Sequence, residues 1–192
     1  MTRYFLFINL VLLCVLSAFG QYEYDVSKDY PFGRANPEAP EQVKDFEPMI
    51  GECDCISVLR KQDGTWAEEE EMLWRFKYIL NGMGIQDESF RKDGSYSGSV
   101  RQYIADSSRW YVHWYSSKGP TTTLPTWEGN KNDEGNIVLY KEQKAPNGMD
   151  GGYRLTFYEM SPTGFKWIGE WVDTSGSIVY PTWKIDCKKR QK

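Results

Sequence analysis

From about Glu68 to Cys187 the chain repeats one pattern, in which short runs of aromatic and β-branched residues alternate with turns rich in Gly, Asn, Asp and Ser. The alternation is clearest over 71–80, where every second residue is large and apolar, and the Asn81-Gly82 pair that follows is a strong hairpin signal. The pattern predicts an all-β protein folded as a single closed antiparallel β-barrel. Small barrels of this kind often hold one ligand in their interior.

We expect about ten strands, over residues 50–60, 71–80, 84–90, 98–104, 109–116, 123–127, 136–141, 152–160, 165–172 and 177–187. Pro125 and Pro181 fall inside two of these ranges, at positions that an edge or a bulge tolerates. Little of the chain remains for helices. A short helix is expected over 40–46, with Pro40 at its start and Glu41 in its first turn, and it would cap one mouth of the barrel.

Residues 1–20 have the pattern of a secretory signal peptide, with Arg3 near the start and an apolar run from Tyr4 to Leu16. Ala18-Phe19-Gly20 fits a cleavage site, which would leave Gln21 as the mature N-terminus. The alternative is a membrane anchor, but the apolar run is shorter than the roughly 20 residues that a spanning helix needs. We therefore expect a secreted or periplasmic protein that does not contact a membrane after cleavage.

The rest of the chain divides into an extended arm or linker over 21–45 and one barrel domain over 46–188. The arm has Pro31, Pro37 and Pro40, several charges and little apolar periodicity. The whole chain has 23 basic and 27 acidic residues, a net charge of −4. A mildly acidic protein with scattered Lys and Arg is not expected to have nucleic acid or an anionic membrane as its main partner. The oligomeric state does not follow from the sequence.

Three cysteines lie beyond the signal segment: Cys53, Cys55 and Cys187. In an oxidising compartment we expect one disulfide and one remaining thiol. Cys55 and Cys187 lie near the two ends of the barrel region, and closure of a barrel makes its first and last strands neighbours. Cys53 is two residues from Cys55 and faces the same side of a strand, so it remains an alternative partner. The three cysteines and His113 match no standard zinc motif, and we expect no metal site.

Several short motifs resemble those of a known group of proteins. They are the opening segment 46–52 (FEPMIGE), Trp74-x-Phe76, Gly82, the segment 85–88 (IQDE), Arg101-x-Tyr103 and Trp110-x-Val112-x-Trp114. The opening segment resembles the first motif of lipocalin-like (calycin) barrels, and the other motifs resemble the DUF1579-like proteins of that superfamily. The chain differs from that pattern at Cys53, where a Trp is usual. The resemblance implies a lipocalin-like, up-and-down barrel with an internal cavity, and it implies neither a substrate nor catalytic residues.

Aromatic residues on the expected strands, and a few polar residues among them, are the candidate ligand-binding groups. They are Trp74, Phe76, Tyr78, Arg101, Tyr103, His113, Trp167, Glu170 and Trp171. His113 would be a haem ligand only if it faced the interior. If Trp110, Val112 and Trp114 line the core instead, His113 points outward, so we expect no cofactor. We assign no catalytic residue, because the chain has no Gly-x-Ser-x-Gly elbow and the neighbouring carboxylates Asp87 and Glu88 lie on opposite faces of the expected strand.

Three functions remain compatible with the sequence. The favoured one is an exported lipocalin-like barrel that binds a small apolar or amphipathic molecule without transforming it, which requires a cavity with few polar groups. The second is an enzyme on the same barrel, such as an isomerase, a cyclase or a hydrolase, which requires titratable groups that converge in the cavity. The third is an interaction module whose barrel is filled with side chains. Whether the protein is an enzyme is left open, with binding preferred.

Overall fold

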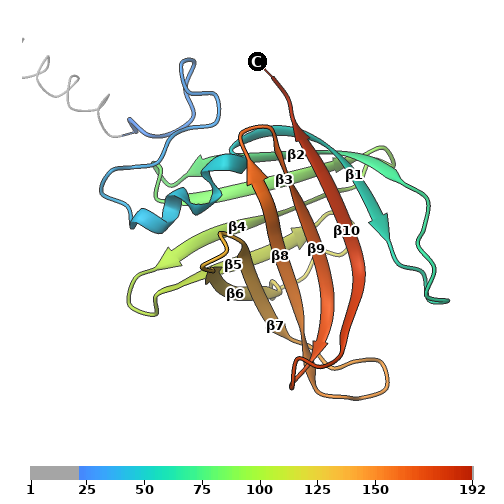
Figure 1. The fold of residues 1–192 in the computed structure, drawn as a ribbon. Helices are drawn as coiled ribbons and strands as arrows, with labels where there is room; N and C mark the ends of the chain where they lie inside the picture. Colours follow the sequence, from blue (N-terminus) through green and yellow to red (C-terminus); the bar gives the residue numbers. More distant parts are fainter. Residues whose placement is uncertain (1–21, 192) are drawn as a thin grey trace, which may run out of the picture.

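The computed structural model describes residues 22–191, so the expected signal peptide lies outside the described residues. Ten antiparallel strands form one closed barrel, in which each strand pairs with the next along the chain and the first pairs with the last (Figure 1). They are β1 (Gly51–Leu59), β2 (Glu70–Ile79), β3 (Gly84–Arg91), β4 (Tyr96–Ile104), β5 (Arg109–Ser116), β6 (Thr126–Lys131), β7 (Ile137–Glu142), β8 (Gly151–Ser161), β9 (Gly164–Asp173) and β10 (Val179–Lys189). The prediction of an all-β, up-and-down barrel of about ten strands is confirmed.

One strand lies in a different place from its prediction. The sequence predicted a strand over 123–127, but β6 begins at Thr126 and continues to Lys131. The residues before Pro125 form a local turn, in which the Thr121 hydroxyl donates to the Thr123 carbonyl and the Thr123 backbone N–H donates to the Thr121 hydroxyl. Local hydrogen bonds of this kind compete with strand pairing. Pro181 does lie in a strand, at a register shift between β9 and β10, as a bulge allows.

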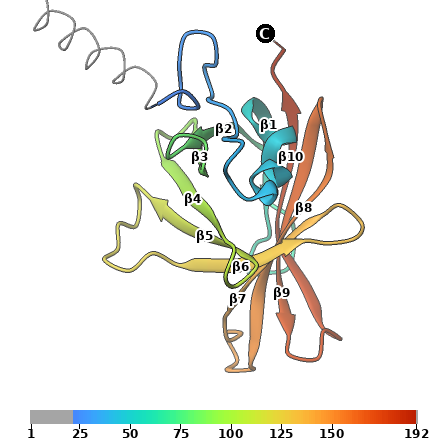
Figure 2. The same ribbon diagram turned by 90° about the vertical axis from the view of Figure 1, so that its left-hand side faces the viewer.

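The short helix closes one end of the barrel (Figure 2). It is a 3₁₀ helix over Glu41–Met49, denoted η1, and is therefore longer than the predicted segment 40–46. Val43, Phe46 and Met49 form its buried face. The Phe46 ring packs edge-on against Trp110, with ring centroids 4.9 Å apart. Because η1 inserts these side chains between the strands, it acts as a plug of the barrel.

The arm that precedes η1 is bound to the hairpin between β2 and β3. The backbone N–H of Tyr24 donates to Asn81 Oδ1 at 2.9 Å, and that of Tyr78 donates to the Phe32 carbonyl at 2.8 Å. Gly82 lies so close to the arm that a Cβ there would be 2.4 Å from the Arg34 carbonyl oxygen. Only glycine fits this contact, and its φ of +80° also favours glycine. The plug and the arm therefore occupy the same end of the barrel.

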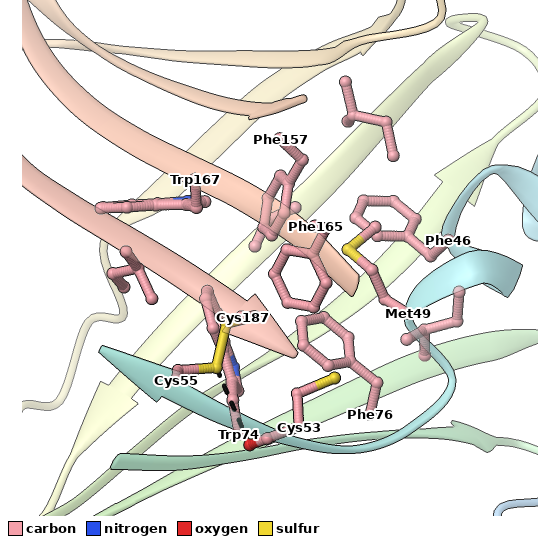
Figure 3. Packing of buried hydrophobic residues seen from close by; sticks show 14 of the residues in the cluster. Phe46, Met49, Cys53, Cys55, Trp74, Phe76, Phe157, Phe165, Trp167 and Cys187 are labelled. Atoms are coloured by element: carbon pink, nitrogen blue, oxygen red, sulfur yellow. Dashed lines mark hydrogen bonds between the residues drawn. A yellow bond between two sulfur atoms is a disulfide. The ribbon is translucent and has the colours of Figure 1, made fainter. Parts of the chain in front are cut away.

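A disulfide joins the first and last strands. Cys55 and Cys187 are directly opposite each other in the pairing of β1 with β10, and their sulfurs are bonded (Figure 3). This is the predicted bridge, and the alternative with Cys53 is wrong. Cys53 is a free, buried thiol on the same face as Cys55. Burial raises the pKa of Cys53 to about 11.

Candidate functional site: the barrel cavity

The barrel is packed near the plug and hollow beyond it. Close to η1, the rings of Phe76, Phe157 and Phe165 fill the interior with Phe46 and Met49 (Figure 3). Further along the strands the inward side chains enclose a cavity of about 230 Å³. This is smaller than the roughly 300–1,000 Å³ of pockets for drug-sized ligands, so a ligand here would be small.

Most of the cavity wall is aromatic or aliphatic. Inward positions of strands from β2 to β10 supply the wall, because alternate residues of a strand face the same side. Its aromatic members are Trp74, Trp114, Trp127, Tyr153, Trp167 and Trp183, with Phe157 at the packed end. Flat rings on several sides favour a flat apolar ligand, because such a ligand can lie against ring faces and edges.

One ion pair lies in the wall of this cavity. Arg101 Nη1 on β4 donates a hydrogen bond to Asp87 Oδ2 on β3, and the two side chains are only 2% and 4% exposed. The carboxylate accepts two further hydrogen bonds, from Trp74 Nε1 at 2.7 Å and from the Ser99 hydroxyl at 2.5 Å. A buried carboxylate with three donors is held in one position, and its charge is balanced by the guanidinium.

The Arg101 guanidinium also contacts the plug. Its central carbon lies 5.0 Å from the ring centroids of both Phe46 and Phe76, which are cation–π distances. Burial lowers the pKa of Arg101, and the neighbouring Asp87 opposes that shift. Because Arg101 contacts the packed rings and also lines the cavity, its guanidinium lies where the packed part of the interior meets the hollow part. Its Nε has no hydrogen-bond partner within residues 22–191.

Two serines add polar groups to the wall. The hydroxyls of Ser89 on β3 and Ser97 on β4 are 2.7 Å apart and hydrogen-bonded to each other. Both residues line the cavity together with Asp87, Ser99 and Arg101. The five polar residues on β3 and β4 thus form one polar side of the wall. The indoles of β9 and β10 belong to other parts of the wall.

Three of the nine predicted ligand-binding residues line the cavity: Trp74, Arg101 and Trp167. Phe76 and Tyr78 are buried nearer the plug, among the packed core residues. Tyr103 is half-buried against Trp110, with ring centroids 5.7 Å apart. Trp171 shares the inward face of β9 with Trp167, but it is not part of the wall of the cavity.

The remaining two predicted residues point away from the barrel interior, although Glu170 is itself only 8% exposed. Glu170 Oε2 accepts a hydrogen bond from Arg154 Nη2 at 2.7 Å and takes part in an outer groove with Tyr140. His113 Nδ1 is 2.8 Å from the Thr126 hydroxyl. Its neighbour Val112 lines the cavity, so His113 faces the opposite side of β5 and does not reach a ligand in the cavity.

The sequence analysis missed Asp87, Ser99, Trp114, Trp127 and Trp183 as parts of the site. Asp87 and its sequence neighbour Glu88 lie on opposite strand faces, and the partner of Asp87 is Arg101 on another strand. The alternation of β3 is the signal that could have found it, because the inward residues are Ile85, Asp87 and Ser89.

Within residues 22–191 no group of three or more His, Cys, Asp or Glu side chains is placed to hold a metal ion. No helix in the same range is long and apolar enough to span a membrane.

These features define a closed, ten-stranded, up-and-down antiparallel β-barrel with an internal cavity. No family model matches the chain, and no curated protein is significantly similar to it. Among solved structures, the chain is similar to the S-type phycobiliprotein lyase CPES from Guillardia theta. The two share 10% sequence identity with a TM-score of 0.43, over 77% of this chain and 91% of that chain. A similarity at this level carries no conclusion about the ligand or the activity of this chain.

Proposed function

We propose that this protein is an exported lipocalin-like barrel that binds a small apolar or amphipathic molecule in its cavity. The observation that carries the proposal is the aromatic wall with a single buried ion pair, Asp87 with Arg101. Apolar walls supply affinity at roughly 25 cal/mol per Å² of surface removed from water. A few fixed polar groups in such a wall orient the ligand.

The cavity favours a binding protein over the two alternatives. An interaction module with a filled barrel would need side chains where the hollow half lies. An enzyme would need a group free to move a proton, whereas the Asp87 carboxylate is engaged by three donors. Fixed acceptors of this kind suit positioning better than proton transfer.

Export and family membership are part of the same proposal. The Cys55–Cys187 bridge is compatible with an oxidising compartment, which supports the assignment of residues 1–20 as a signal peptide. The intact mass of the exported protein should then correspond to a chain that begins at Gln21. The motif resemblance supports membership of the DUF1579-like group of the calycin superfamily.

Binding can be tested with the fluorescent probe N-phenyl-1-naphthylamine, which is small, aromatic and uncharged. We expect its fluorescence to rise on binding to the disulfide-bonded protein. Ser97→Phe places a ring in the cavity and should weaken binding at least about tenfold, since the ring would occupy the space of the ligand. Val100→Phe is the matched control, because Val100 lies on the same strand and faces outward.

Both variants should keep the circular dichroism spectrum of the parent protein. If Ser97→Phe does not fold, Leu155→Trp tests the same point from β8, because Leu155 also lines the cavity. Equal affinity of the probe for the parent and for a folded, blocked variant would show that the probe binds elsewhere. That result would contradict the proposed function.

A further inference from the structure

Two buried N–H groups in the cavity wall have no acceptor within residues 22–191: Arg101 Nε and Trp127 Nε1. Buried donors are normally hydrogen-bonded, and an unpaired one is costly, most of all on a charged group. Two other indoles of the cavity wall are hydrogen-bonded, since Trp74 Nε1 donates to Asp87 and Trp183 Nε1 donates to Ser57 at 2.8 Å. The two unpaired donors are therefore exceptions that need an explanation.

The pairing of the strands places both donors at one level of the barrel. Arg101 is opposite Val112 in the pairing of β4 with β5, and Trp127 is opposite the same Val112 in the pairing of β5 with β6. All three residues line the cavity. Adjacent strands are roughly 4.8 Å apart, so the backbones of Arg101 and Trp127 are separated by about two such spacings. Arg101 and Trp127 therefore lie on the same part of the cavity wall, on either side of Val112.

The charge of the site limits what can accept these hydrogen bonds. The charges of Asp87 and Arg101 already balance each other in a nearly inaccessible position. A ligand carboxylate beside them would be repelled by Asp87 and would bring a further negative charge into an apolar cavity, which is strongly unfavourable. Lys141, whose Nζ lies 4.9 Å from the centroid of the Trp127 ring, is not part of the cavity wall. An uncharged oxygen, such as that of a ketone, an aldehyde or an amide, accepts the same hydrogen bonds without this penalty.

We propose that the natural ligand is a flat, uncharged, aromatic or conjugated molecule whose carbonyl-type oxygens accept hydrogen bonds from Arg101 Nε and Trp127 Nε1. The inference rests on the proposed function, because it names the ligand class of the same cavity. The aromatic wall sets the flat shape, and the two unpaired donors set the position of the acceptors on one edge of the ligand.

Three probes of nearly equal shape test the inference. 2-Acetylnaphthalene carries an uncharged acceptor, 2-isopropylnaphthalene carries none, and 2-naphthoate carries a charged one. Their affinities can be compared by displacement of N-phenyl-1-naphthylamine from the disulfide-bonded protein. We expect 2-acetylnaphthalene to bind roughly 10- to 100-fold more tightly than 2-isopropylnaphthalene, as a hydrogen bond to a charged group provides. We expect 2-naphthoate to bind more weakly than 2-acetylnaphthalene.

Variants identify the donors. Trp127→Phe removes one unpaired N–H and should reduce the preference for the acetyl over the isopropyl probe by at least about threefold. Trp110→Phe is the matched control, because its Nε1 already donates to Asp45 and the residue lies outside the cavity wall. The double variant Asp87→Asn with Arg101→Met leaves no unpaired buried charge and should remove most of the remaining preference.

The outcomes separate this inference from the proposed function. Equal affinities for the acetyl and isopropyl probes would leave a binding barrel in place and overturn the inference. Tighter binding of 2-naphthoate than of 2-acetylnaphthalene would overturn the uncharged character of the ligand. A loss of preference in Trp110→Phe equal to that in Trp127→Phe would overturn the role of the Trp127 N–H. Failure of all three probes and of N-phenyl-1-naphthylamine to bind would contradict the proposed function and the inference together.

Discussion

The Asp87–Arg101 pair should couple two mutations strongly in a double-mutant cycle. Asp87→Asn leaves the charge of Arg101 without a counterion in a side chain that is 2% exposed. Breaking a buried pair in this way typically costs about 3–5 kcal/mol of the free energy of unfolding. Arg101→Met leaves Asp87 with the donors Trp74 and Ser99, so its cost should lie at the lower end of that range.

The double variant, Asp87→Asn with Arg101→Met, removes both charges at once. Because replacement of a whole buried pair is often close to neutral, the double variant should be more stable than Asp87→Asn alone. The coupling free energy should then be at least about 2 kcal/mol. Adding the second mutation should thus restore stability that the first removed.

Urea unfolding followed by tryptophan fluorescence measures all four corners of the cycle, with the free energy of unfolding extrapolated to zero denaturant. The exposed pair Arg109–Glu128 is the control, because both side chains are about half exposed and their coupling should stay below about 1 kcal/mol. If the losses of the two single variants simply add in the double variant, within about 0.5 kcal/mol, the buried pair is not coupled and our reasoning about its charge balance is wrong.

Three further predictions concern stability. The disulfide is tested in a Cys53→Ala background, which prevents thiol exchange. Replacement of Cys55 and Cys187 by Ser should lower the free energy of unfolding by roughly 4–5 kcal/mol, because the bridge closes a loop of 132 residues. An unchanged urea midpoint would contradict this. The pKa of Cys53 is raised from 9.0 to about 11, so the stability it contributes is present below pH 9 and is lost as the pH rises toward 11. The parent protein should therefore lose stability relative to Cys53→Ala between pH 9 and 11. Parallel pH profiles of the two proteins would contradict this prediction. Phe46→Ala removes the largest side chain of the plug and should cost about 3–5 kcal/mol in the same urea assay; a cost below about 1 kcal/mol would mean that the plug is not part of the core.

The strands were predictable because two local signals agree along most of the chain. Alternation over 71–80 and the Asn81-Gly82 turn locate β2 and the start of β3 without knowledge of the rest of the fold. The signals disagree near Pro125, where a short apolar run precedes a proline. There the hydrogen bonds between Thr121 and Thr123 form a turn, and β6 begins only at Thr126. The periodicity of the sequence does not reveal such bonds.

The cavity was less predictable than the strands that enclose it. Alternation indicates which residues face inward, so Trp74, Arg101 and Trp167 could be named from the sequence. Alternation does not indicate which inward residues the plug covers, and this separates Phe76 from Trp74 on the same strand face. The partner of Arg101 is Asp87 on another strand, and only the pairing of the strands brings the two side chains together.

The disulfide between β1 and β10 makes the chain from Cys55 to Cys187 a covalent ring. Every loop at the end of the barrel opposite the plug lies within this ring. A protease that cuts one of these loops therefore opens the ring without separating any fragment, and the strands on the two sides of the cut stay tethered. A nicked molecule would remain one covalent unit, heavier by the one water added at the cut, until the bridge is reduced and the two pieces can separate. In an oxidising compartment, where the bridge stays closed, the barrel should therefore survive a single cleavage.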